Sequence, residues 1–248
     1  MSWEWQVFLN DDGSGRTYLE WIIQAWGWTL SVAACAWVLS VSFGVVIGTL
    51  RTVTKYPWVV LAGNIWVEVF RNIPILVQVF LWYFVLPRIF PSMQHWSGFV
   101  LVVLALGFFT SSRIAEQVKA GINALPRGQG MAALAMGLTP LQSYRYVILP
   151  MALRVILPPL TSESMNLLKN SSVAFAVSIP ELTMFAMQAQ EETSRGIEIY
   201  LAVTLLYAVS AFAVNRLMAA LERHLQIPGA GSASGSDKAA VPSISGGH

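Results

Sequence analysis

The stretch ALPRGQGMAALAMGLTPLQSYRYVILP, residues 124–150, decides how this chain is interpreted. It lies between long apolar runs, yet it is neither a membrane span nor an ordinary polar loop. Pro126 suits the first position of a helix, and Gly137 suits a helix end. Thr139 and Pro140 suit the N-cap and the first residue of a second helix. This punctuation predicts a helix, a sharp turn and another helix.

The first of these helices, over 126–136, is apolar and bland. Small residues and methionine follow one another without a break, as Met131, Ala132, Ala133, Leu134, Ala135 and Met136. Small residues let another backbone come close, and methionine adapts to irregular surfaces. A helix of this kind outside the bilayer must be covered. It lies either in a groove of a partner protein or against the ends of the chain's own spans. The second helix is expected to end at Pro150.

Composition identifies lipid as the main solvent of the chain. Of its 248 residues, 55% are hydrophobic and only 11% are charged, whereas soluble domains carry about 25% charged residues. Membrane-spanning helices need about 20 apolar residues. Four segments meet that length, namely 21–50, 56–86, 89–112 and 155–179, and a fifth, 199–215, is short but bounded by charges. We therefore expect an all-α membrane protein with five transmembrane helices.

Basic residues are divided unequally between the two sides of the expected membrane. Three of them share the opposite side with seven acidic residues, and ten follow spans one, three and five: Arg51, Lys55, Arg113, Lys119, Arg127, Arg145, Arg154, Arg216, Arg223 and Lys238. The positive-inside rule then places the N-terminus outside and the C-terminus in the cytoplasm. The formal net charge of +2 does not indicate nucleic-acid binding. The basic residues are explained by their positions in the loops between spans.

This orientation divides the chain into three parts. Residues 1–20 form a periplasmic N-terminal segment, and residues 21–222 form the transmembrane domain, with 126–149 as its cytoplasmic segment. Residues 223–248 are expected to be a cytoplasmic and largely disordered tail, because glycine, serine and alanine dominate its end and leave little to bury.

Residues 124–150 resemble the cytoplasmic signature of binding-protein-dependent ABC importer permeases. That signature reads Glu-Ala-Ala, three residues, Gly, about nine residues, and Ile-x-Leu-Pro. The match includes Ala132, Ala133, Gly137 and 148–150, whereas Met131 stands at the position of the glutamate. In the family this segment is the coupling helix that docks on an ATPase. The resemblance therefore implies six ATPase-coupling residues: Met131, Ala132, Ala133, Gly137, Leu138 and Pro140.

Two further stretches indicate the branch of the family. Residues 67–78 resemble the polar amino acid branch, with its pattern Glu-x-x-Arg-x-x-Pro. Residues 161–175 and 178–182 are most similar to the glutamate/aspartate permeases. The resemblance implies import of these amino acids across the bacterial inner membrane by alternating access. It also implies three protein partners: an ABC ATPase dimer, a second and homologous permease subunit, and a periplasmic substrate-binding protein.

Several absences agree with a subunit that is not an enzyme. The sequence has no Gly-x-x-x-x-Gly-Lys-Ser/Thr phosphate loop. We therefore expect no cofactor in this chain, with ATP and Mg²⁺ used by the partner ATPase. The histidines, His95, His224 and His248, lie outside the spans, so a membrane hydrolase with a Ser–His pair is improbable. A stand-alone ion-coupled transporter, and a permease for basic or neutral amino acids, remain as alternatives.

Polar residues within the expected spans are candidates for the substrate pathway, because ionisable groups at membrane depth are costly. These candidates are Glu68, Arg71, Glu163, Asn166, Lys169 and Asn170. Asn64, Glu68, Arg71 and Gln78 recur at helical spacing along one stripe. Pro74 is expected to kink its helix. The Pro158-Pro159 pair suggests a second helix that is broken or restarted.

The charges of these candidates would complement an acidic amino acid, which carries two carboxylates and one ammonium. Arg71 and Lys169 could bind the carboxylates, and Glu163 could bind the ammonium. A second interpretation needs no substrate. Glu68 and Arg71 could pair within one helix, and Glu163 could pair with Lys169 across subunits. The sequence leaves both interpretations open.

Overall fold

The computed structural model describes residues 4–53 and 55–225, and every regular element in that part is helical. The helices of eight or more residues are α1 (Tyr18–Leu50), α2 (Pro57–Asn72), α5 (Gly98–Asn123), α6 (Arg127–Ala135), α8 (Leu149–Asn170), α9 (Leu182–Thr193) and α10 (Gly196–Leu225). The shorter ones are η1 (Trp5–Leu9), α3 (Ile75–Phe80), η2 (Leu81–Val85), α4 (Leu86–Ile89), η3 (Pro91–Met93), α7 (Pro140–Ser143), η4 (Tyr144–Ile148) and η5 (Ser171–Val177).

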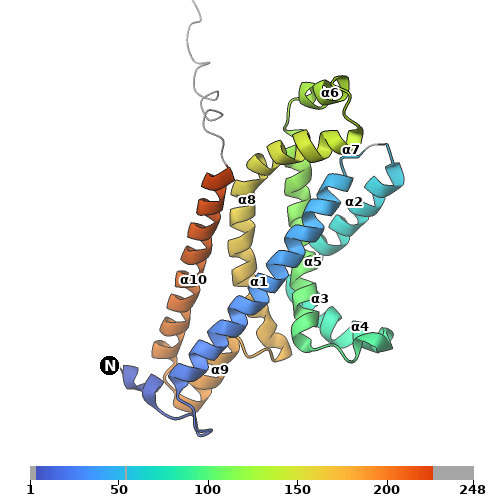
Figure 1. The fold of residues 1–248 in the computed structure, drawn as a ribbon. Coiled ribbons are helices and arrows are strands. Elements are labelled where there is room, and N and C mark those ends of the chain that lie inside the picture. The colour runs from blue at the N-terminus through green and yellow to red at the C-terminus, as the bar shows by residue number, and fades with distance from the viewer. Residues whose placement is uncertain (1–3, 54, 226–248) are drawn as a thin grey trace, which may run out of the picture.

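Three of these helices are long and apolar enough to cross a membrane, namely α1, α5 and α10. Two bent pairs pass the same test together. The pair Pro57–Asn72 and Ile75–Ile89 bends by 104°, and the pair Pro140–Val177 and Leu182–Thr193 bends by 53°. The five predicted spans correspond to counting each bent pair once. Figure 1 shows the described N-terminal end and the end of α10 at opposite ends of an elongated bundle.

The centre of the bundle is the contact between α1 and α5. Two glycines on α1 let the helices approach closely. A Cβ added to Gly44 would lie 2.5 Å from Ile114 Cγ2, and one added to Gly48 would lie 2.6 Å from Val118 Cβ. Because these positions carry no side chain, the two backbones pack almost directly. The pair is therefore the element against which the other helices are arranged.

Pro74 breaks its span as predicted, but the Pro158-Pro159 pair does not. Helix α8 runs through both prolines and ends at Asn170. The break in that span lies further on, where η5 ends at Val177, Ser178 follows with φ at +61°, and Pro180 precedes α9. The prediction was wrong because paired prolines can remain in a helix whose neighbours pack against it. A non-glycine residue in left-handed geometry has no simple sequence signal.

The second helix of the cytoplasmic segment does not end at Pro150, which corrects another prediction. Residues 144–148 form a π-helix, η4, and α8 follows without interruption. A π-helix, η2, likewise precedes the helix that contains Pro87. A proline ring clashes with the carbonyl four residues earlier, and a widened turn relieves such a clash. The cytoplasmic segment therefore continues stiffly into the bundle.

The third span lies later in the chain than the expected 89–112. Ile89 belongs to α4, and α5 extends from Gly98, behind an N-cap at Ser97, to Asn123. Arg113 is therefore inside a helix of the bundle and not in a loop. Of the expected tail, 223–225 belong to α10, whereas residues 226–248 lie outside the described part of the chain.

Candidate functional site

The cytoplasmic segment forms an elbow whose geometry follows from three residues. After α6 ends, Gly137 adopts φ +86° and its amide donates to the carbonyl of Leu134 at 3.0 Å. The amide of Leu138 donates to the carbonyl of Ala133 at 3.2 Å. This pair of bonds is a Schellman motif, which satisfies the last carbonyls of a helix. The predicted helix stop is confirmed.

The second arm of the elbow begins as predicted at Pro140. Thr139 is the N-cap, and its hydroxyl accepts from the amide of Gln142 at 3.3 Å. The side chain of Gln142 in turn accepts from the amide of Thr139 at 2.8 Å. This reciprocal capping box saturates the start of α7. The turn between the two arms of the elbow is therefore determined locally, by the cap at the end of α6 and the cap at the start of α7.

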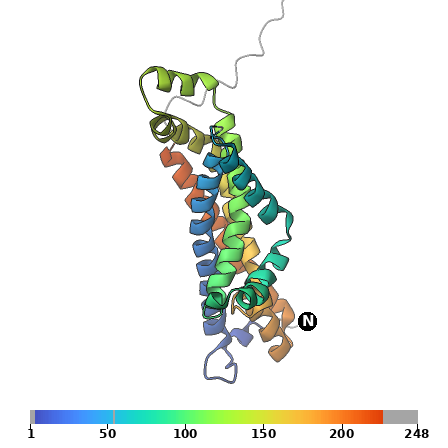
Figure 2. The same ribbon diagram turned by 90° about the vertical axis from the view of Figure 1, so that its right-hand side faces the viewer.

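Much of the elbow's apolar surface is uncovered. Ala133 is buried against the chain, but Met136 is 84% exposed and Leu141 is 80% exposed. Exposure is also high at Met131 and Leu134, and Ala132, Gly137 and Pro140 are exposed as well. Leu138 is half-buried. Figures 1 and 2 both show α6 projecting beyond the ends of the long helices. The sequence allowed the apolar surface to be covered by a partner protein or by the chain's own spans. The chain's own spans cover only the smaller part of it.

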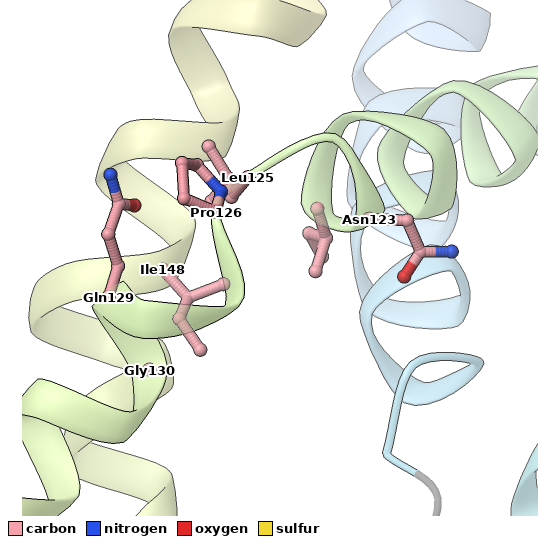
Figure 3. A pocket seen from close by; sticks show the side chains of 7 residues that line it. Asn123, Leu125, Pro126, Gln129, Gly130 and Ile148 are labelled. Carbon is pink, nitrogen blue, oxygen red and sulfur yellow. The ribbon is translucent and has the colours of Figure 1, made fainter.

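A cavity of about 470 Å³ lies where the elbow meets the bundle. It is lined by residues of the α5 end, the linker, α6 and η4: Ile122, Asn123, Leu125, Pro126, Gln129, Gly130 and Ile148. Figure 3 shows Pro126 and Gln129 on one side and Asn123 on the other. The elbow is therefore attached by a short linker and is not packed tightly on α5.

Two predicted pathway residues pair with each other on α2. Arg71 Nη2 lies 3.6 Å from Glu68 Oε1, and Asn72 Nδ2 donates to Glu68 Oε2 at 2.7 Å. Both charged side chains are open, with 45% of Arg71 and 61% of Glu68 exposed. The pairing within one helix is the one expected from their spacing. Their exposure leaves both charges available to a neighbour of this chain.

Gln78 does not continue the polar stripe of α2, because the helix ends before it. Its side chain is buried, and Nε2 donates to the carbonyls of Phe70 at 2.7 Å and Ile73 at 3.0 Å. Pro74 has no amide hydrogen to pair with the Phe70 carbonyl four residues earlier, and the Ile73 carbonyl lies just beyond the end of α2. The amide therefore closes the sharp bend between α2 and α3, and the prediction that Gln78 shares a face with Glu68 was wrong.

Glu163 is buried on α8 and is held by α5. Arg113 Nε donates to Glu163 Oε2 at 2.8 Å, and Arg113 Nη2 donates to Glu163 Oε1 at 2.9 Å. Gln117 Nε2 adds a third bond at 3.1 Å. This two-pronged pair is among the stronger ion-pair geometries. The sequence pattern suggested Lys169 as the partner of Glu163. Arg113 was not considered, because the third span was expected to end at residue 112 and Arg113 was therefore expected in a loop.

The other α8 candidates lie along the end of that helix. Asn166 and Asn170 are half-buried, and Lys169 is exposed. A second buried carboxylate, Glu181, follows in the break before α9. It accepts from the amides of Thr183 at 2.9 Å and Met184 at 3.0 Å and from the Tyr207 hydroxyl at 2.9 Å. Glu181 is thus a helix cap. The Pro-Glu step before an apolar run was the available signal for it.

A small charged loop occupies the other end of the bundle. Asp12 accepts hydrogen bonds from Ser14 and pairs with Arg16, and these contacts, Ser14 first, lower its pKa to about 2. A lowered carboxyl pKa stabilises the loop above about pH 4, and this contribution is lost as the pH falls through about 2. The loop before α1 is therefore charged and paired throughout the neutral range.

The family model described as "Binding-protein-dependent transport system inner membrane component" matches residues 22–227. This chain belongs to that family. It is accordingly a multi-pass permease of the inner membrane, and the matched residues include its exposed elbow.

Curated relatives of this permease transport amino acids. It is 40% identical over 240 residues to the glutamate/aspartate import permease protein GltJ of Escherichia coli K12, covering 92% of this chain and 97% of the relative. It is 35% identical to the probable amino-acid ABC transporter permease protein PatM of Vibrio harveyi, over 73% of this chain and 81% of that one. The permease is therefore an amino-acid ABC importer subunit.

Solved structures share its fold. The crystal structure of an amino acid ABC transporter with histidines has a TM-score of 0.72 and 30% identity, covering 84% of this permease and 95% of that chain. An inward-facing MetNI methionine ABC transporter has a TM-score of 0.71 at 20% identity, covering 84% and 98%. At 20% identity, the second structure supports only the similarity of fold.

Proposed function

We propose that this permease imports glutamate and aspartate as one subunit of an ATP-driven, binding-protein-dependent transporter. The support for this substrate class is the 40% identity with GltJ, which extends over 97% of that relative. Motifs in 67–78 and 161–182 agree with it. The amino acid is the substrate, and ATP with Mg²⁺ is used by a separate ATPase subunit.

The observation that carries the proposal is the uncovered elbow. Met136 and Leu141 are more than three-quarters exposed on a segment whose central turn is closed by its own helix caps. An apolar surface of this kind marks a protein contact, and a groove on an ATPase dimer would cover it. Alternating access then follows, because α8 begins without a break behind the elbow and transmits its displacement. A periplasmic substrate-binding protein delivers the amino acid from outside.

A second permease subunit would cover the open charges of α2. Glu68 and Arg71 are exposed on a predicted span, where contact of a charge with lipid would be costly. A pathway enclosed between two permeases removes that cost, because the charges then face water or the partner. The homologous different chain that the resemblance implies would supply the opposite wall of this pathway.

Within this pathway Arg71 and Lys169 would attract the substrate carboxylates, with Asn166 and Asn170 nearby on α8. Glu163 would reach the substrate ammonium only after releasing Arg113, which holds both of its oxygens. The same release would free the Arg113 guanidinium for a carboxylate. Substrate recognition would therefore exchange one ion pair for others rather than leave a buried charge unpaired.

The proposal is tested by purifying the permease from its native membrane and identifying the co-purifying subunits. Reconstitution with them should give ATP-dependent uptake of labelled glutamate, competed by aspartate but not by arginine or glutamine. Uptake by the permease alone would contradict the ATPase dependence. Competition by arginine or glutamine would instead favour a basic or neutral amino acid permease, a class represented among relatives such as the probable glutamine permease protein GlnP of Bacillus subtilis, 32% identical.

A further inference from the structure

Arg51 at the end of α1 joins three helices. Arg51 is buried, and its Nε donates to Asn64 Oδ1 of α2 at 2.8 Å. Its Nη2 pairs with Glu116 Oε1 of α5 at 2.6 Å. Gly63 leaves room for this side chain, since a Cβ there would lie 2.6 Å from Arg51 Cγ. The cation is therefore held between α2 and α5.

The next residue, Thr52, contacts the elbow. The Tyr144 hydroxyl lies 3.1 Å from Thr52 Oγ1 and donates to the Thr52 carbonyl at 3.3 Å. Tyr144 is the first residue of η4, directly after α7. Figure 1 shows the turn between α1 and α2 at the same end of the bundle as α7. Two consecutive residues therefore join three elements: Arg51 contacts α2 and α5, and Thr52 contacts the elbow.

We propose that the Arg51–Thr52 corner positions α2 according to the position of the elbow. This inference rests on the proposed function, because it assumes that the elbow is moved by an ATPase. A buried charge with partners on two helices cannot slide by small steps without losing its bonds. A displacement of Tyr144 is then passed through Thr52 and Arg51 to Asn64, and α2 carries Glu68 and Arg71 with it.

The corner gives the elbow a second connection to the bundle. The first is the continuous backbone from η4 into α8, which leads to Glu163. The second leads through Tyr144 to α2 and its open charges. Both walls of the proposed pathway would therefore respond to one movement. A route through α8 alone would leave α2 without any direct response to the motor.

The test uses the complete transporter reconstituted in nanodiscs with its ATPase and loaded binding protein. Tyr144→Phe removes the hydroxyl that meets Thr52, and Asn64→Ala removes the acceptor on α2. Tyr200→Phe is the matched control, because Tyr200 is an exposed tyrosine on α10, outside the elbow. The readout is the ratio of ATPase rates with and without loaded binding protein, together with the KM for ATP and the amount of assembled complex.

Tyr144→Phe and Asn64→Ala should each lower the stimulation ratio by about three- to tenfold, with unchanged KM for ATP and unchanged assembly. The double variant should be no worse than the worse single variant, because the two contacts act in series. Tyr200→Phe should match the wild type. A merely structural role would give independent, multiplying losses that track the thermal stability of the complex.

Two results would overturn the inference: wild-type stimulation in Tyr144→Phe, or multiplying effects in the double variant. If Asn64→Ala does not assemble, Tyr144→Phe with Thr52→Val completes the same cycle at the other contact. Failure of the proposed function looks different. In that case the wild-type complex itself would show no ATPase stimulation, and no variant would be needed to see it.

Discussion

Single residues set the shape of the elbow through their backbone geometry. Gly137 has φ +86°, and a Cβ added there would meet nothing within 4 Å. Space is therefore not what selects glycine at this position. Left-handed geometry costs a residue with a Cβ about 1–2 kcal/mol, and the cost is smaller for asparagine than for most residues. Proline cannot adopt this geometry, since its ring holds φ near −65°.

This makes Gly137 a residue whose replacement should separate membrane insertion from function. Gly137→Pro should abolish transport-coupled ATPase activity in the reconstituted transporter while the amount of inserted permease stays normal. Gly137→Asn, which tolerates the same φ, should keep most of the activity and is the control. Undiminished uptake by Gly137→Pro would contradict the docking role of the elbow.

Gln78 allows a second prediction at this scale. Gln78→Leu keeps the approximate volume but leaves the Phe70 and Ile73 carbonyls unpaired at the bend, at a cost of about 1–3 kcal/mol. The thermal unfolding temperature of the purified transporter should fall accordingly. Gln94→Leu, on an exposed turn, should leave it unchanged. An equal effect of both substitutions would show that the Gln78 amide does not hold the bend.

At the scale of helices, the close packing of α1 on α5 organises the bundle. Gly48 faces Val118 and the carbonyl of Ala115, which a Cβ would approach to 2.6 Å and 2.8 Å. Backbone at that distance cannot turn aside as a flexible side chain would. Gly27, on the same α1 helix, has nothing within 4 Å of such a Cβ. The two glycines thus differ in their surroundings and not in their helix.

Gly48→Ala should therefore push α1 away from α5 and destabilise the permease by about 1–3 kcal/mol. Gly27→Ala should be neutral or stabilising by up to about 1 kcal/mol, because alanine is the better helix former. Thermal unfolding in detergent measures both. Equal stability of the two variants would mean that α1 and α5 are not packed as closely as the structure has them.

The whole molecule has two ends with different chemistry. The acidic loop around Asp12 lies at one end, and the elbow with its apolar surface lies at the other (Figure 1). The distribution of basic residues predicts which end faces the cytoplasm. Lys119 lies near the end of α5, Arg145 lies in η4 and Arg154 lies near the start of α8, on the side to which the positive-inside rule assigns the cytoplasm.

Cysteine labelling tests this orientation. Cys35 is exposed and is first replaced by alanine. A membrane-impermeant maleimide should then label Ser14→Cys in cells with a permeable outer membrane, and it should label His224→Cys, at the end of α10, only after the inner membrane is opened. Both positions are exposed in the chain, so access alone decides the result. Labelling in the reverse order would contradict the assigned orientation.

Local signals in the sequence determined the apolar segments, the caps of the elbow, the break at Pro74 and the pairing of Glu68 with Arg71. Each depends on residues a few positions apart, whose hydropathy or backbone geometry is specific enough to read directly. Tertiary structure alone decided that Arg113 binds Glu163, that Arg51 joins α2 and α5, and that α8 continues through Pro158-Pro159. Those contacts connect residues up to 65 positions apart, and the packing of neighbouring helices selects among partners that a sequence pattern cannot distinguish.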